Sequence, residues 1–356
     1  MIILDNIDIS RGSFEKEEYR MNLGYIKKAK VGLNYFLKRT RLPAGQIVGF
    51  TIEPTNICNL RCVYCPQSDH DNHFINGRGY MSFETFKSIL DNLLADFTPN
   101  YVSLHRDGEP MLNKELDQFI QYTVSKGLKA IMSSNCTLLT KERSEALLQS
   151  GLSLIKTDFC ADKKLYEELR AGAKWDTTYE GMLNILSLAR TMKKSFQLNI
   201  TDISTHGVSK TLAGERTSAL GKLFNDYNDD VVITRVHFHN ALEESVTSLG
   251  RRQDMPKKYT LCHHPWVHIV VDFKGNVVPC CRDLRSECIC GSLLNNKMSF
   301  IWNDKPFLDI RTALKDQKPE EINICGKCDL PYAGSYSGTG FASRVKNLFF
   351  SKMWKR

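Results

Sequence analysis

The chain has 356 residues, a formal net charge of +8 and 42% hydrophobic residues, which are the proportions of a soluble globular protein. It has no apolar run long enough to cross a bilayer, and its N-terminus lacks the basic start and apolar stretch of a signal peptide. We therefore expect a cytoplasmic protein, and the absence of an RNA-binding aromatic motif argues against nucleic acid as a partner.

Residues 1–45 are a basic N-terminal extension. Apolar residues recur in it at helical spacing beside lysines and arginines, which predicts an amphipathic helix with a basic face. We expect this helix to pack against the main domain, and peripheral contact with a membrane surface is the alternative.

From residue 46 to 242 short apolar strands alternate with amphipathic helices. An apolar helical stripe runs from Phe83 to Phe97, and Ser82 is its expected N-cap. The expected strands are 49–53, 101–105, 129–134, 153–159, 196–201 and 231–238. Six β–α units in a row predict an α/β fold, with a parallel sheet covered by helices.

The remaining chain divides into three predicted parts. A polar linker spans 243–258, and a cysteine-rich domain follows over 259–335. Within that domain, residues 267–278 have the pattern of a β-hairpin around Lys274-Gly275-Asn276. Residues 336–356 form a basic tail, for which plain solvation is favoured over docking to a partner or a membrane.

Three cysteines follow the first predicted strand with the spacing Cys-x3-Cys-x2-Cys: Cys58, Cys62 and Cys65. In a reducing compartment such clustered thiols bind metal or do redox work. Three thiolates can hold three irons of a 4Fe–4S cube and leave the fourth iron open to an outside ligand. The alternatives are an electron-transfer cluster and a zinc site, for which His70 is the nearest fourth ligand.

This loop resembles the signature of the radical S-adenosylmethionine (SAM) superfamily. The resemblance implies a partial (β/α)6 TIM-like barrel as the radical SAM core. It also implies that SAM chelates the open iron and is cleaved reductively to a 5′-deoxyadenosyl radical, which abstracts hydrogen from a substrate.

The same resemblance implies a set of SAM-binding residues. They are Tyr64 beside the adenine; Asp107, Gly108 and Glu109 in a segment similar to the family's Gly-Gly-Glu-Pro, near the amino group; Ser133 and Asn135 near the ribose; and Arg170 at the carboxylate. Asp107 stands where the family has its first glycine. Cys136 also replaces a usual glycine, and the sequence offers no interpretation of that change.

A second group of cysteines follows the predicted linker. Cys262 is followed by twelve residues, Gly275, four residues and Cys280, and later by Cys325 and Cys328. Four thiolates are enough to close a second cube or to hold a structural zinc. The pattern resembles the twitch domain, the shortened form of the SPASM extension, and implies one auxiliary 4Fe–4S cluster with only protein ligands. The other cysteines have no assigned role: Cys136, Cys160, Cys281, Cys288 and Cys290.

The resemblance implies a radical SAM oxidoreductase that oxidises or rearranges a small sugar, aminosugar or polyol, with the auxiliary cluster as electron acceptor. Related twitch-domain enzymes include an aminocyclitol dehydrogenase. A flavodoxin or ferredoxin-type protein is the expected electron donor. The alternatives are a maturase of ribosomally made peptides and a non-catalytic metal-binding module. The catalytic residues stay unknown, and four strand-end residues are only candidates for a general base: His105, Arg106, Asp158 and Asp162.

Overall fold

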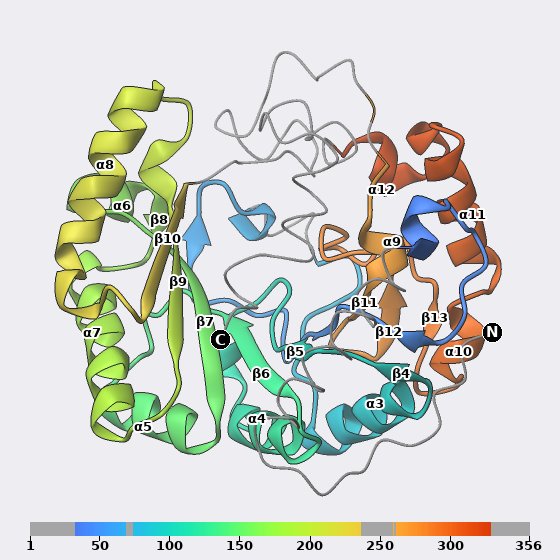
Figure 1. The fold of residues 1–356 in the computed structure, drawn as a ribbon, viewed down its shortest axis with the longest axis horizontal. Helices are drawn as coiled ribbons and strands as arrows, with labels where there is room; N and C mark the ends of the chain where they lie inside the picture. The colour runs from blue at the N-terminus through green and yellow to red at the C-terminus, as the bar shows by residue number, and fades with distance from the viewer. Residues whose placement is uncertain (1–32, 69–73, 236–258, 260, 329–356) are drawn as a thin grey trace, which may run out of the picture.

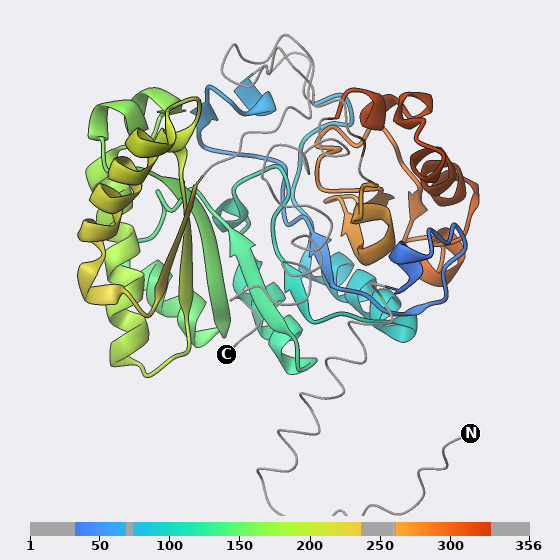
Figure 2. The ribbon, with the colours of Figure 1, turned by 45° about the horizontal axis from the view of Figure 1, so that its top comes forward.

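We describe a computed structural model of the chain, which covers residues 33–68, 74–235, 259 and 261–328. The predicted linker over 243–258, the tail over 336–356 and His70 lie outside these residues, as does most of the N-terminal helix. The fold comprises a nine-stranded sheet with helices on its outer side (Figure 1 and Figure 2).

Six parallel strands of this sheet follow one another in chain order, which confirms the predicted β–α repeat. They are β2 (Gly49–Ile52), β5 (Tyr101–Ser103), β6 (Lys129–Ser133), β7 (Leu152–Phe159), β9 (Gln197–Asp202) and β10 (Val231–Arg235). Parallel strands in sequential order, each joined to the next through helical segments, are the arrangement of a partial TIM-like barrel. Their carboxyl ends therefore meet at one rim, where such barrels build their sites.

Helices cover the outer face of the sheet: α3 (Phe83–Asp96), α4 (Leu116–Ser125), α5 (Lys141–Gln149), α6 (Lys163–Leu169), α7 (Trp175–Thr191) and α8 (Lys210–Leu223). Helix α3 follows the predicted stripe, because Phe86, Ile89 and Leu93 are fully buried. Ser82 caps α3 as predicted, since its side chain accepts a hydrogen bond from the Thr85 N–H at 3.3 Å. Burying each such side chain stabilises the fold by about 1.5–3 kcal/mol.

The C-terminal domain continues the barrel sheet. Its predicted hairpin consists of β11 (His268–Val271) and β12 (Asn276–Val278), which pair antiparallel, and β13 (Gly291–Ser292) extends it. Gly275 turns the hairpin with φ of +84°, a conformation that glycine adopts without strain. Strand β11 also pairs in parallel with β2, so the two domains share one sheet. The helices of this domain are α9 (His264–Val267), α10 (Met298–Ile301), α11 (Lys305–Lys315) and α12 (Asn323–Gly326).

The described end of the N-terminal extension packs on the C-terminal domain, beside α9 and α11 (Figure 1). The Trp266 indole N–H donates to the Arg39 carbonyl at 2.7 Å, and the buried Arg311 donates to the Thr40 carbonyl at 3.1 Å. This differs from the expected packing on the main domain, because the side chains that donate to the carbonyls of this segment belong to the later helices α9 and α11. Across the described part of the chain, no helix has the length and apolarity of a membrane span.

Candidate functional site

The first three cysteines lie on a loop that begins where β2 ends. The short strand β3 (Arg61–Cys62) anchors this loop by pairing antiparallel with β8 (Arg170–Ala171), which places Cys62 opposite Arg170. A turn follows β3, in which the Cys65 N–H donates to the Cys62 carbonyl at 2.9 Å. The loop is thus held against the segment that follows α6, at the carboxyl rim of the sheet.

The chemistry of these three thiols fits a bound iron–sulfur cluster. Burial raises the pKa of Cys58, Cys62 and Cys65, and the thiol groups also act on one another electrostatically. Three neighbouring thiolates are therefore costly without a cation, and binding to iron removes that cost. The Asn135 amide lies 3.9 Å from the Cys58 sulfur, where it can donate to a thiolate.

The turn that contains Gly108 fits tightly under this loop. A β-carbon at Gly108 would lie 2.4 Å from the Thr55 carbonyl oxygen and 2.6 Å from the Ile57 carbonyl oxygen. The next N–H, of Glu109, donates to Ile57 at 2.8 Å. Asp107 is not among the residues with positive φ, so its replacement of a glycine adds no backbone strain. Glycine at 108 therefore lets the two backbones touch.

Glu109 is a buried carboxylate held by three donors. It accepts hydrogen bonds from the Met111 N–H at 3.1 Å, the Ser134 hydroxyl at 3.0 Å and the Asn135 N–H at 2.7 Å. Burial raises the pKa of Glu109, and its charge also acts on Cys58. The sequence singled out Ser133, but the hydroxyl that reaches Glu109 is that of Ser134. The carboxylate thus has a fixed position beside the first cysteine.

Tyr64, Asp158 and Arg170 form a polar triangle on the other side of the loop. Asp158 accepts from the Tyr64 hydroxyl and from Arg170, both at 3.1 Å, and Arg170 also donates to the Tyr64 hydroxyl at 3.0 Å. Among the described residues the buried Arg170 Nε has no hydrogen-bond partner. A guanidinium with a spare donor therefore lies near the cysteine loop, opposite in charge to Glu109.

Asn135 and Cys136 shape the end of β6. The Asn135 amide donates to the Asn59 side chain at 2.8 Å, which ties the strand end to the cysteine loop. Cys136 is buried with φ of +62°, the left-handed conformation that glycine prefers. The backbone at this position is therefore glycine-like, although the residue is cysteine.

The four cysteines of the second pattern line one cavity, together with Pro265, Pro279, Arg282, Leu314 and Ile324. The space within it that protein atoms leave free is about 420 Å³, part of it open to solvent. Burial raises the pKa of the Cys280 and Cys325 thiols, which also act electrostatically on Cys262. Four thiols and a cation around one space fit an anionic cluster with only protein ligands. In the described residues, no group of three or more His, Cys, Asp or Glu side chains is arranged to hold a single metal ion.

Three of the other cysteines are tied into the protein itself. The buried Cys160 donates to the Asp162 carbonyl at 3.4 Å, and the buried Cys290 donates to the Cys288 carbonyl at 3.8 Å. Burial raises the pKa of Cys281, and the nearby cations Arg282, Lys156 and Arg106 partly offset this rise, so the thiol lies near cations of both domains.

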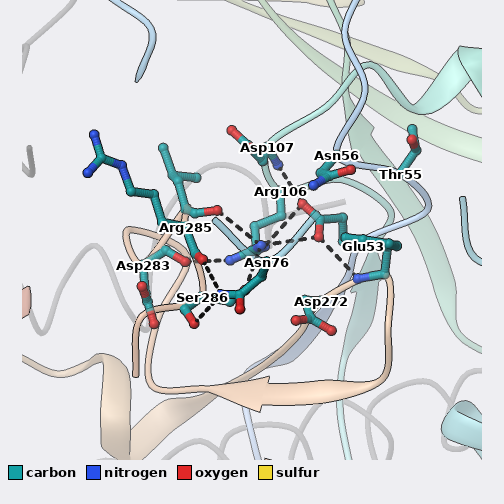
Figure 3. A network of polar contacts seen from close by, with 12 residues as sticks. Glu53, Thr55, Asn56, Asn76, Arg106, Asp107, Asp272, Asp283, Arg285 and Ser286 are labelled. Atoms are coloured by element: carbon teal, nitrogen blue, oxygen red, sulfur yellow. Dashed lines mark hydrogen bonds and ion pairs between the residues drawn. The ribbon is translucent and has the colours of Figure 1, made fainter. Parts of the chain in front are cut away.

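A buried ion pair connects the two cysteine sites (Figure 3). Arg106 donates to Glu53 from Nε at 3.1 Å and from Nη2 at 3.2 Å. The same guanidinium donates to the Asp283 carbonyl, and to the Ser286 hydroxyl at 3.0 Å, in the loop after Cys280. Arg106 therefore joins the barrel to the C-terminal domain. A guanidinium stays protonated and has no acceptor, so Arg106 cannot serve as a general base. The Asp107 N–H donates to the same Glu53 carboxylate at 3.1 Å.

Comparison with known families gives two matches. The radical SAM superfamily model matches residues 52–194, and the model of an iron–sulfur cluster-binding domain, SPASM, matches residues 262–329. Together they contain all seven cysteines of the two patterns.

Several known proteins are similar to this chain. The S-adenosyl-L-methionine-dependent 2-deoxy-scyllo-inosamine dehydrogenase of Niallia circulans is 24% identical over 78% of this chain and 91% of its own length. The Fe-coproporphyrin III synthase of Methanosarcina barkeri is 32% identical over 36% of this chain and 32% of its own length.

Two solved structures share the fold. The anSMEcpe structure with bound AdoMet has a TM-score of 0.57 at 15% identity, over 85% of this chain and 98% of that one. The structure of BtrN in complex with AdoMet and 2-DOIA has a TM-score of 0.50 at 20% identity, over 79% of this chain and 92% of that one.

Proposed function

Because this chain belongs to the radical SAM superfamily and carries a C-terminal iron–sulfur cluster-binding domain, we propose that it oxidises or rearranges a small sugar, aminosugar or polyol. Its enzyme class, a SAM-dependent radical oxidoreductase, is supported by the family together with the similarity to a dehydrogenase. The substrate class rests on the similarity to the 2-deoxy-scyllo-inosamine dehydrogenase, which extends over both domains of this chain.

One observation carries the oxidative form of the reaction: the two cysteine sites belong to one continuous sheet. Strand β2, which leads into the first cysteine loop, pairs along its length with β11 of the C-terminal domain. Arg106 adds a second connection, from the barrel rim to the loop after Cys280 (Figure 3). A substrate between the two sites would be near both a radical source and an electron acceptor.

The cofactors are assigned to the residues whose chemistry fits them. Cys58, Cys62 and Cys65 would hold the SAM-binding cluster, and Cys262, Cys280, Cys325 and Cys328 the auxiliary cluster. When bound, these groups and SAM supply a 5′-deoxyadenosyl radical for hydrogen abstraction and an acceptor for one electron.

The surrounding residues would bind and orient SAM. Glu109, fixed by three donors, would accept a hydrogen bond from the amino group, and Arg170 would use its spare Nε donor for the carboxylate. Tyr64, held by Asp158 and Arg170, would contact the adenine, and Asn135 would contact the ribose. Asp107 and Gly108 form the turn that packs against the cysteine loop beside these residues.

The cellular partners belong to the same proposal. A flavodoxin or ferredoxin-type protein would supply the reducing electron, and such acidic carriers suit a chain of net charge +8 in the cytoplasm.

An isotope-transfer experiment tests the proposed function. Anaerobically reconstituted enzyme is reduced with dithionite and given SAM with polyols, including 2-deoxy-scyllo-inosamine, that carry deuterium on their carbinol carbons. We expect deuterium in 5′-deoxyadenosine and a ketone that has lost one deuterium and one hydrogen. Unlabelled 5′-deoxyadenosine with every alcohol, or labelling only from a peptide, would instead support the maturase alternative.

A further inference from the structure

Lys156 lies on the same side of β7 as Asp158, and no step described so far uses it. Along this strand Ile155, Thr157 and Phe159 are buried, while Lys156 and Asp158 alternate with them and are both half-buried. Side chains two residues apart point to the same side of a strand, so Lys156 lies roughly 7 Å along β7 from Asp158. Asp158 itself contacts Tyr64 of the first cysteine loop.

The surroundings of Lys156 contain no carboxylate that pairs with it. Its strand neighbours are the uncharged Ser133 on β6 and Asn199 on β9. The titratable groups that interact electrostatically with Lys156 are His105 after β5, His268 on β11 and Cys281 from the C-terminal domain. Within the described part of the chain the Lys156 side chain makes no hydrogen bond or ion pair, whereas its backbone carbonyl accepts from the Ser134 N–H at 2.9 Å. A half-buried lysine without a partner destabilises a fold, which is typical of a functional group.

Lys156 also lies between the two proposed cofactor sites. On one side, Asp158 of the same strand belongs to the Tyr64 triangle. On the other side, Cys281 directly follows Cys280, which lines the cavity of the second site. A substrate held between the two sites would therefore lie near this amine.

We propose that Lys156 is a catalytic residue that accepts the hydroxyl proton of the substrate alcohol, an inference that rests on the proposed function. In this step the substrate O–H bond breaks, its electron pair stays on oxygen, and an N–H bond forms at the neutral Lys156 Nζ. The carbinol carbon loses its hydrogen atom to the 5′-deoxyadenosyl radical that SAM cleavage supplies. The substrate then loses one electron to the auxiliary iron–sulfur cluster and becomes a ketone.

The competing bases are less suitable. Burial lowers the pKa of His105 and of His268 to about 3 each, so neither imidazole binds a proton well near neutral pH. Burial also lowers the pKa of Lys156 from its ordinary value, which favours the neutral amine that the step requires. Arg106 is committed to Glu53, and Asp162 caps α6 through the Leu165 N–H.

The test compares three variants of the reconstituted holoenzyme: Lys156→Met, Lys156→Arg and Lys164→Met. Lys164 is the matched control, because its side chain on the surface of α6 is 87% exposed. The measurements are ketone formation in a single turnover, its dependence on pH, deuterium transfer into 5′-deoxyadenosine, and the substrate dissociation constant by calorimetry without reductant.

We expect both Lys156 variants to lose ketone formation by about 100-fold or more. Their substrate dissociation constants should stay within about 3-fold of wild type, and added methylamine should restore the Lys156→Met rate in proportion to its free-base concentration. Ketone formation at the wild-type rate in either variant would overturn the proposal. So would an Arg variant that restores both binding and turnover, because this would make Lys156 an anchor for an anionic substrate. Absence of deuterium transfer in the wild type would refute the proposed function instead.

Discussion

Arg106 and Glu53 form a two-pronged ion pair in the interior of the protein, with side chains only 2% and 0% exposed. Glu53 directly follows β2, just before the first cysteine loop, whereas Arg106 follows β5 and reaches into the C-terminal domain. Glu53 also accepts from the Phe273 N–H of the hairpin at 3.1 Å. One carboxylate and one guanidinium thereby fix the relative position of both candidate cofactor sites.

Replacement of Arg106 by Met should destabilise the protein by about 3–5 kcal/mol, because Glu53 would be left as an unpaired buried charge. The measurement is the free energy of urea unfolding. The control is Lys163→Met, whose partner Asp176 is 74% exposed, and we expect that variant to lose less than about 1 kcal/mol. Equal effects of the two substitutions would show that the buried pair has no special role.

Replacement of Gly108 by Ala should abolish SAM binding, because the new β-carbon would collide with the Thr55 carbonyl 2.4 Å away. This collision would shift the cysteine loop relative to Glu109. Gly214→Ala is the control, since it lies inside α8 with its nearest neighbour 3.5 Å away, and alanine favours a helix by about 1 kcal/mol. SAM affinity of the reconstituted variants, measured by equilibrium dialysis, should fall only for Gly108→Ala.

The stability of the protein should decline as the pH falls below about 6.5, the ordinary pKa of histidine. Burial lowers the folded-state pKa of His105 and of His268 to about 3, so the unfolded chain takes up these protons first. The stabilisation is complete above the unfolded pKa and is lost between the two values, by at most about 1.4 kcal/mol per pH unit for each histidine.

His268→Gln tests this linkage, because glutamine can keep the hydrogen bond that Thr51 makes to the ring at 2.9 Å. The variant should lose less stability than wild type between about pH 7 and pH 5 when thermal unfolding is followed. An unchanged pH dependence would show that His268 titrates normally in the folded protein.

Lys156→Met should stabilise the protein near neutral pH, independently of any activity. Burial lowers the pKa of Lys156 in the folded state, so the unfolded chain binds an extra proton below its own pKa of about 10.4. Wild-type stability therefore rises with pH towards that value, and the advantage of methionine should shrink as it does. A variant that is less stable than wild type at about pH 7 would contradict the absence of a partner for Lys156.

Cys280→Ala should remove about four iron atoms per reconstituted chain, whereas Cys281→Ala should leave the iron content unchanged. The two residues are adjacent, but Cys280 lines the cavity of the second site, and Cys281 faces Lys156. Iron and sulfide analysis measures the difference. Loss of iron from the Cys281 variant alone would exchange the roles of the two residues.

The repeating architecture could be predicted from the sequence because the spacing of hydrophobic residues distinguishes its strands from its helices. The six strands, the α3 stripe, the Ser82 cap and the Gly275 hairpin depend on local patterns, and the structure confirms each of them. The pairing of β11 with β2 was not predicted, because two short apolar strands far apart in sequence give no signal of their register.

The site was predictable to the extent that its residues fall in spaced motifs. The four cysteines that the sequence groups in the second pattern line one cavity, and their role as cluster ligands stays a prediction. Arg106 was only a candidate base, since its partners in the loop over 283–286 are distant in sequence. Lys156 was missed altogether, although the alternating segment Lys156-Thr157-Asp158 placed a charged residue on the same face as Asp158. Whether a lysine has a partner depends on tertiary packing, which no local pattern encodes.

Mössbauer spectroscopy of enzyme reconstituted with isotopically enriched iron tests the account most directly, in a Cys262→Ala/Cys328→Ala variant that retains the first cysteine loop. We predict a single cube in which one iron changes its spectrum when SAM is added, because that iron has no cysteine ligand. A cube whose irons are all indifferent to SAM, or a loop occupied by zinc, would contradict the account.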